Sequence, residues 1–370
     1  MEQKILTADN NFFQLDEYIV NHGMKNILLV CGKSFDKLNL SNHLKEFADN
    51  KSIKICKFSD FKPNPDYESV VKGVEEFRNN NCDSIIAVGG GSAMDVAKCI
   101  KLFANMPDSS NYLNQEIVPN EIPFIAVPTT AGTGSEATRF AVIYYKGEKQ
   151  SVNHESCIPS AVLFDTSVLD TLPEYQRKAT MLDAFCHAVE SFWSVNSTED
   201  SKEDSRKAIH LILTNYELYL ENNIKGNECM LLAANYAGKA INVTQTTAGH
   251  AMCYKLTSRY GISHGHAAAL CVSVLWQYMI SNTKLCIDSR GSEYLEKTFT
   301  DLAKAMGGRV AADGAGIFNS ILDKLELSKP SANEDEIDIL KKSVNPVRLK
   351  NNPVQLDEKT IEYLYRQILG

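Results

Sequence analysis

The chain has 370 residues, of which 44% are hydrophobic and 23% charged, as is ordinary for a globular protein large enough for two domains. A net charge of −8 and the lack of a basic run argue against a nucleic-acid partner. No apolar run approaches the ~18 residues of a membrane span, and the N-terminal segment lacks the parts of a signal peptide. The ten cysteines form no C-x-x-C pair, so we expect reduced thiols in a cytoplasmic protein.

The first part of the chain alternates short apolar runs with helical patterns. The apolar runs are NILLVCG, IKICKFS, DSIIAVG, PFIAVP and SAVLF. Strands that are separated by single helices imply parallel pairing with right-handed crossovers. We therefore predict that residues 1–170 form an α/β domain with a doubly wound, mostly parallel sheet.

The remainder of the chain has apolar residues at helical spacing, as in residues 175–193, 205–220, 229–244 and 267–280. Alternating runs typical of strands are not evident there. We predict an all-α domain over residues 171–370, in which the polar stretch 194–205 connects two helices.

Two glycine-rich loops follow strands of the first domain. Gly89, Gly90, Gly91 and Ser92, with Asp95 after them, come directly after one apolar run and precede a helix. Glycines let the backbone approach a pyrophosphate closely, and a helix N-terminus attracts its charge. The second loop, residues 129–136, offers hydroxyls suited to phosphate, ribose or nicotinamide. Each loop alone can be an ordinary turn, but two such loops in one domain favour a nucleotide.

Asp183, His187, His250 and His264 form a predicted metal site. The first two are four positions apart, so a helix places them on one face. The other two are expected on a second helix and at the start of a third. One carboxylate and three imidazoles suit Fe(II), Zn(II) or a similar divalent metal. The alternative is that each histidine is a hydrogen-bonded residue of the core or the surface.

These segments resemble the iron-containing, or group III, alcohol dehydrogenase family. The matching motifs are GGGSAMDVAK, VPTTAGTGSEAT, DAFCHAVE, GHAM and SHGH, in this order. The resemblance implies a dinucleotide-binding domain that faces a helical domain, with Fe2+ (or Zn2+) and NADPH or NADH in the cleft between them. It implies that the metal ligands are Asp183, His187, His250 and His264. It further implies that the NAD(P) site is lined by Gly89, Gly90, Gly91, Ser92, Asp95, Thr129, Thr130 and Thr133.

Three further segments, ESFWSVNSTEDS, HAMCYKLTSRYGISHGHA and NPVRLKNNPVQL, resemble the phosphonoacetaldehyde reductase branch of that family. We therefore predict a metal-dependent NAD(P)H oxidoreductase that reduces a short aldehyde to a primary alcohol. The expected substrate is phosphonoacetaldehyde, with 2-hydroxyethylphosphonate as the product. The alternatives are a general iron-type alcohol or diol dehydrogenase, a lyase similar to dehydroquinate synthase, and a non-catalytic binding protein. The expected partners are a small-molecule substrate and a second copy of the chain in a homodimer.

The chain departs from the common family pattern in two places. Gly32 and Lys33 stand where many members carry an acidic residue that binds the adenosine ribose. Without that carboxylate a 2′-phosphate is not repelled, which favours NADPH, unless this loop touches no cofactor. Tyr254 stands where many members have a histidine proposed to relay protons. Tyr254, His266 or water must then deliver the proton, and His266 has the alternative role of orienting the site.

A phosphonate dianion needs fixed positive charge, which arginine supplies best. Arg259 is the first candidate, because it lies between the third and fourth predicted ligands. The alternative for each basic residue is a solvated surface charge. The other candidates for substrate binding are Arg139, Lys255, Arg348, Asn351 and Asn352.

Overall fold

The computed structural model describes residues 3–8, 11–108 and 110–370. The chain divides into two compact units by its internal contacts. The first unit holds the chain up to Thr130 together with Gly134–Leu172, and the second holds Ala131–Thr133 together with Pro173–Gly370. None of the described helices is long and apolar enough to cross a membrane.

The first unit is built on a parallel sheet of six strands in the order β1-β8-β5-β4-β2-β3, and a β6-β7 hairpin stands apart from it. The inner strands β2, β4, β5 and β8 are nearly continuous apolar runs, as expected of a sheet that is covered on both faces. The strands are β1 (Lys4–Thr7), β2 (Asn26–Cys31), β3 (Lys54–Phe58), β4 (Ser84–Gly89), β5 (Phe124–Pro128), β6 (Phe140–Tyr145), β7 (Glu148–Asn153) and β8 (Ala161–Phe164).

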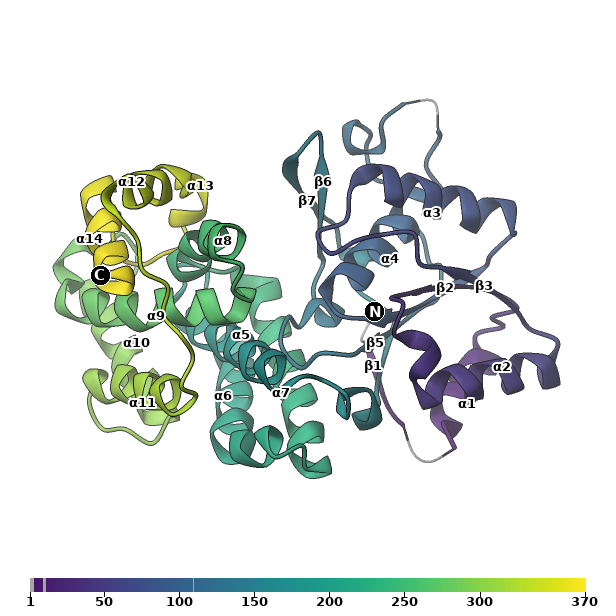
Figure 1. Cartoon of the computed structure of the whole chain (residues 1–370), viewed down its shortest axis with the longest axis horizontal. Coiled ribbons are helices and arrows are strands. Elements are labelled where there is room, and N and C mark those ends of the chain that lie inside the picture. The colour runs from purple at the N-terminus through teal and green to yellow at the C-terminus, as the bar shows by residue number, and fades with distance from the viewer. Residues whose placement is uncertain (1–2, 9–10, 109) are drawn as a thin grey trace. The chain divides into compact units, whose positions relative to one another are not determined.

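Helices cover both faces of this sheet, which confirms the predicted doubly wound α/β fold. The helices are α1 (Phe13–Asn21), α2 (Asn39–Lys51), α3 (Tyr67–Asn79) and α4 (Gly91–Phe103). One face packs on α1 and α2 through a buried cluster that includes Leu15, Leu44, Leu29, Val88 and Val127. Figure 1 shows α3 and α4 on the opposite side of the sheet, where both contact strands.

The strand order places a topological switch point between β2 and β4. From β2 the chain moves outward to β3 and then crosses back to β4 on the other side of β2. Because all these strands are parallel, β2, β4 and β5 end at the same edge of the sheet. Open α/β sheets bind their ligands beyond this edge, at the switch point.

Two features of the first unit are absent from the sequence-based prediction. One is β1, which pairs with β8 at the edge of the sheet. The other is the β6-β7 hairpin, which turns at Lys146 and Gly147. Both of these residues have positive φ, 54° and 80°, as a two-residue hairpin turn of the I′ type requires.

The second unit is helical, as predicted. Its central helix is α5, which contacts α6, α7, α9 and α10. Apolar residues on all sides of α5 are buried, as expected of a helix inside a core. The helices are α5 (Glu174–Trp193), α6 (Glu199–Leu220), α7 (Ile224–Thr244), α8 (Ala248–Tyr260), α9 (His264–Ser281), α10 (Ser292–Ala305), α11 (Ala311–Lys324), α12 (Glu334–Ser343), α13 (Pro346–Leu349) and α14 (Glu358–Leu369).

The prediction that residues 194–205 form a connection is wrong for their second half, because α6 begins at Glu199. Thr198 caps the helix: its hydroxyl accepts a hydrogen bond from the Ser201 amide at 3.1 Å, and the Ser201 hydroxyl accepts one from the Thr198 amide at 2.9 Å. The acidic residues that follow suit the positive end of a helix dipole. The polar composition is therefore a helix-start signal.

Candidate active site

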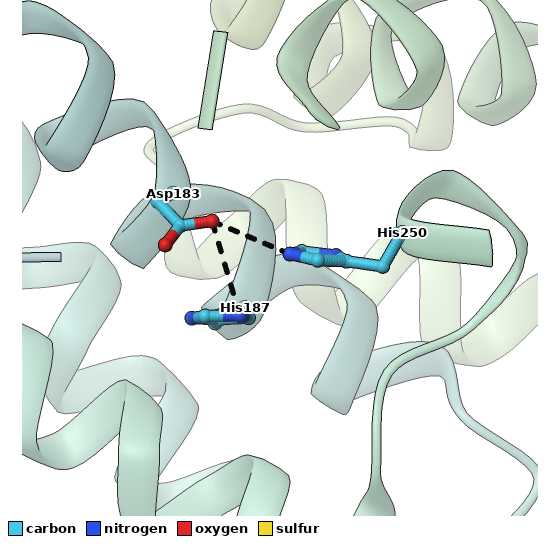
Figure 2. A group of neighbouring side chains, drawn as sticks. All are labelled: Asp183, His187 and His250. Atoms are coloured by element: carbon cyan, nitrogen blue, oxygen red, sulfur yellow. Dashed lines mark hydrogen bonds and ion pairs between the residues drawn. The ribbon is translucent and has the colours of Figure 1, made fainter. Parts of the chain in front are cut away.

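Three predicted metal ligands converge inside the second unit. Asp183 and His187 come from α5 and His250 comes from α8 (Figure 2). One ligand atom of each residue lies within 4.8 Å of the other two. Oδ1 of Asp183 is 3.4 Å from Nε2 of His250 and 4.0 Å from Nε2 of His187. All three side chains are buried, so each of their polar atoms needs a partner, and one cation could serve all three residues.

Glu190, which the sequence analysis did not single out, contacts the far side of the His250 ring. It lies three residues after His187 on α5 and is fully buried. Its carboxylate accepts hydrogen bonds from Nδ1 of His250 and, at 2.6 Å, from the hydroxyl of Thr247. Because Nδ1 is used in this way, Nε2 is the nitrogen that His250 presents to Asp183. A carboxylate that orients a histidine from its far side is a recurrent feature of metal sites.

The charges of the cluster shift the pKa of each member. Burial would raise the pKa of Asp183, but the rings of His187, His250 and His264 outweigh it and hold that pKa well below its ordinary value. Burial lowers the pKa of His187 to about 4, against the attraction of Asp183. Burial would also lower the pKa of His250, but the charges of Glu190 and Asp183 raise it to about 9. An ionised carboxylate among buried imidazoles fits a divalent cation such as Fe(II) or Zn(II).

His264, the fourth predicted ligand, lies next to the cluster at the start of α9. Its ring centroid is 5.3 Å from that of His250, and its Nδ1 is 3.5 Å from Sγ of Cys253. It is not part of the tight three-atom group. The next residue, Gly265, packs directly on α5: a Cβ there would lie 2.0 Å from the carbonyl oxygen of Ala179. His264 thus stays a predicted ligand, held near Asp183 by a close helix contact.

The two residues predicted to handle a proton lie in different places. The ring of Tyr254 stacks on that of His264 with centroids 5.4 Å apart, and its hydroxyl accepts a hydrogen bond from Nη1 of Arg348 at 2.7 Å. Burial raises the pKa of Tyr254, although the charge of Arg348 opposes this. His266 lies two positions after His264 on α9 and therefore on another side of the helix. Its Nδ1 is 3.2 Å from the hydroxyl of Tyr175. The described contacts give Tyr254, and not His266, a place beside the cluster.

Two of the basic residues predicted to bind the substrate are paired with carboxylates. Arg259 donates to Oε1 of Glu336 through two nitrogens, at 3.0 and 2.8 Å. Arg139 in the first unit donates to Glu155 at 2.7 Å. Each of these two arginines therefore already has a carboxylate partner, and substrate binding by either one stays a prediction. Lys255 directly follows Tyr254 on α8 and is partly buried.

The C-terminal candidates take separate roles. Asn351 connects its segment to the rest of the unit: its carbonyl accepts from the Val195 amide, and its side chain contacts Asn196 and Thr246. Asn352 is fully buried and donates to the carbonyl of Val354. Both asparagines therefore hold the backbone in place, while Arg348 reaches Tyr254.

The predicted cofactor loops lie at the switch point of the first unit. Gly32 and Lys33 follow β2, while Gly89 ends β4 and Gly91 and Ser92 begin α4. Thr129 and Thr130 follow β5, and the Thr129 amide donates to the carbonyl of Gly89 at 3.0 Å. Position 89 requires glycine, since a Cβ there would lie 2.6 Å from Cβ of Ala93. The start of α4 has the free amides of any helix N-terminus, so the loop suits a phosphate.

Two other predicted cofactor residues have structural partners. Asp95 accepts a hydrogen bond from the hydroxyl of Ser135 at 3.2 Å. Burial raises its pKa to about 6, although the charge of Lys98 opposes this. Thr133 belongs with the second unit, where the neighbouring Gly132 packs so closely that a Cβ would lie 2.6 Å from the carbonyl of Thr180.

Comparisons with known proteins cover both units. The family model described as iron-containing alcohol dehydrogenase matches residues 2–166, and the one described as Fe-containing alcohol dehydrogenase family, C-terminal, matches residues 178–369. The chain is 28% identical to the phosphonoacetaldehyde reductase of Streptomyces viridochromogenes, over 80% of this chain and 78% of that protein.

Solved structures give a similar result. An iron-containing alcohol dehydrogenase from Thermotoga maritima is 28% identical with a TM-score of 0.84, covering 100% of this chain and 98% of that one. Sulfoacetaldehyde reductase from Bifidobacterium kashiwanohense, solved in complex with NAD+, is 24% identical with a TM-score of 0.87, covering 99% and 96%. At this level of identity, the similarity to the sulfoacetaldehyde reductase shows a shared fold.

Proposed function

Because the chain belongs to the iron-containing alcohol dehydrogenase family, we propose that it is a metal-dependent NAD(P)H reductase of a short aldehyde. The proposed reaction is the reduction of phosphonoacetaldehyde to 2-hydroxyethylphosphonate, the substrate named for the Streptomyces relative. The observation that carries the proposal is the convergence of Asp183, His187 and His250 on one buried point. A site of this kind suits a reaction that needs charge stabilised at a carbonyl oxygen.

Asp183, His187 and His250 would hold Fe(II) or Zn(II), with His264 as the fourth ligand. The bound metal would act as a Lewis acid toward the carbonyl oxygen, and the reduced nicotinamide would supply the hydride. Glu190 fixes the ring of His250 so that Nε2 faces the other ligands. The buried carboxylate of Asp183 stays ionised and offsets part of the charge of a divalent cation.

Tyr254 is the residue that we propose as proton donor to the product. Its hydroxyl accepts from Arg348, and its own hydrogen can pass to the alkoxide oxygen. Its raised pKa keeps the phenol protonated until that moment. The loops Gly89 to Ser92 and Thr129 to Thr130 would bind the dinucleotide, and Gly32 with Lys33 would admit the 2′-phosphate of NADPH.

A general alcohol or diol dehydrogenase is the second candidate function. It is favoured by the ion pairs of Arg259 and Arg139, which remove two of the charges predicted to bind a phosphonate. A cytoplasmic location and a homodimer stay predictions from the sequence.

Steady-state kinetics on metal-reconstituted protein separate the two functions. We expect kcat/KM for phosphonoacetaldehyde to exceed that for acetaldehyde, with NADPH accepted as the reductant. A preference for acetaldehyde would support the general dehydrogenase. The absence of NAD(P)H oxidation with every aldehyde would contradict both functions.

A further inference from the structure

We propose that Arg348 is the residue that binds the anionic group of the substrate, a phosphonate or a similar tetrahedral oxyanion. The inference rests on the proposed function, because it places this group beside the predicted aldehyde site. It assigns the charge recognition to the C-terminal segment of the chain, where α13 contacts α8.

The first argument is the charge environment of the arginines. Arg259 and Arg139 each donate to a glutamate. Among the described residues, Arg348 donates a hydrogen bond to the neutral hydroxyl of Tyr254, and no carboxylate lies within ion-pair distance of it. Arg348 is also partly buried. A guanidinium without a carboxylate partner keeps its charge available for an anionic ligand.

The second argument is position. The guanidinium carbon of Arg348 lies 4.9 Å from the ring centroid of Tyr254. That ring stacks on His264, and Tyr254 stands one turn after His250 on α8. Arg348 therefore contacts a residue that itself stacks on the predicted metal ligand His264.

The third argument is that the arginine is held in place. Asn345 caps α13 by accepting from the Val347 amide at 2.9 Å. Asn351 then ties the segment to Val195, Asn196 and Thr246. These contacts hold the backbone on both sides of Arg348, whose guanidinium is a planar fork of N–H donors that can bind an oxyanion through two bonds at once.

The test compares Arg348→Gln with Lys350→Gln, which removes one positive charge from an exposed position of the same segment. Each variant is assayed with phosphonoacetaldehyde and with propanal, after melting curves have shown that it is folded. For Arg348→Gln we expect kcat/KM for phosphonoacetaldehyde to fall roughly 10- to 150-fold more than kcat/KM for propanal. For Lys350→Gln we expect the two values to change by less than about threefold relative to each other.

Equal losses on both aldehydes in Arg348→Gln would overturn the assignment. A selective loss in Arg259→Gln, with none in Arg348→Gln, would return the role to Arg259. A calorimetric titration of the metal-reconstituted protein with ethylphosphonate gives a readout that does not depend on turnover. If the wild-type protein prefers propanal, the proposed substrate is wrong. Weaker binding of ethylphosphonate to Arg348→Gln than to Lys350→Gln would still support the anion site, and equal binding would overturn it.

Discussion

Glu190 and His250 are joined by a hydrogen bond in the core of the second unit, from Nδ1 of the imidazole to the carboxylate. Glu190 also accepts from Thr247, whose hydroxyl in turn accepts from the indole of Trp193 at 3.0 Å. The carboxylate is thus fixed on both oxygens, and it fixes the imidazole. His250 can then bind a metal through Nε2 with little further loss of side-chain conformational entropy, because its ring is already oriented.

Glu190→Gln should therefore weaken metal binding by about 10- to 100-fold, because the amide keeps the shape but loses the charge that orients the ring. The measurement is a titration of metal-free protein with Zn2+ against a chromophoric chelator. Ser191→Ala serves as the control. Ser191 is equally buried on α5, but its hydroxyl hydrogen-bonds to Ser205 and to the carbonyl of Ala188. The metal affinity of Ser191→Ala should therefore equal that of the wild type. An unchanged affinity in Glu190→Gln would show that Glu190 only fills space.

Metal removal should lower the thermal stability of the protein. Asp183, His187 and His250 bring buried polar atoms together, and a cation that binds the folded state alone stabilises it by mass action. At a free metal concentration of 100 times Kd, the free energy of unfolding rises by about 2.7 kcal/mol. For a folded unit of about 200 residues this corresponds to a rise of roughly 5–10 °C in Tm. Calorimetry before and after chelation measures this shift. The difference should vanish in Asp183→Ala, and a full shift in that variant would mean that the metal binds elsewhere.

Gly265→Ala should separate α9 from α5. A Cβ at this position would lie 2.0 Å from the carbonyl oxygen of Ala179 and 2.6 Å from Cβ of Asp183, so backbone has to move. We expect a loss of about 1–3 kcal/mol in the free energy of unfolding and a weaker metal affinity, since His264 begins the displaced helix.

The matched control for this change is Gly316→Ala on α11, where a Cβ meets no atom within 4 Å. That variant should gain about 0.5–1 kcal/mol, because alanine favours the helix, and its metal affinity should stay unchanged. A normal affinity in Gly265→Ala would show that His264 does not depend on this contact. Urea unfolding and the chelator titration supply the two readouts.

Local patterns in the sequence predicted the fold and the centre of the site. The four-residue spacing of Asp183 and His187 lies within one helix, so the periodicity alone places both side chains on one face. Glu190 lies on the same face and was missed, because a single glutamate in a helix is usually solvated. The spacing of Glu190 to His187 is visible in the sequence, but the burial of Glu190 is not, and burial is what distinguishes it from a solvated glutamate.

Contacts between segments that are distant in the chain could not be predicted from the sequence. The partner of Arg259 is Glu336, on another helix, and no periodicity connects the two. Arg348 was one candidate among several for the same reason, and its contact with Tyr254 depends on how α13 packs on α8. The polar stretch before α6 was a different failure, in which capping residues resembled a loop.

Coenzyme choice gives the last prediction. Gly32 directly follows β2 at the switch point, and a Cβ there would meet no atom within 4 Å, so an aspartate fits without strain. A carboxylate at this position can bind the ribose hydroxyls of NADH and repels the 2′-phosphate of NADPH. In Gly32→Asp we expect the ratio of kcat/KM for NADPH to that for NADH to fall by at least about tenfold, since like charges at contact cost several kcal/mol. Gly316→Asp adds the same charge to the helical unit, at a position where a Cβ also meets no atom within 4 Å, and should leave the ratio unchanged. An unchanged ratio in Gly32→Asp would mean that the loop after β2 does not reach the adenosine ribose, and that Lys33 is an ordinary surface charge.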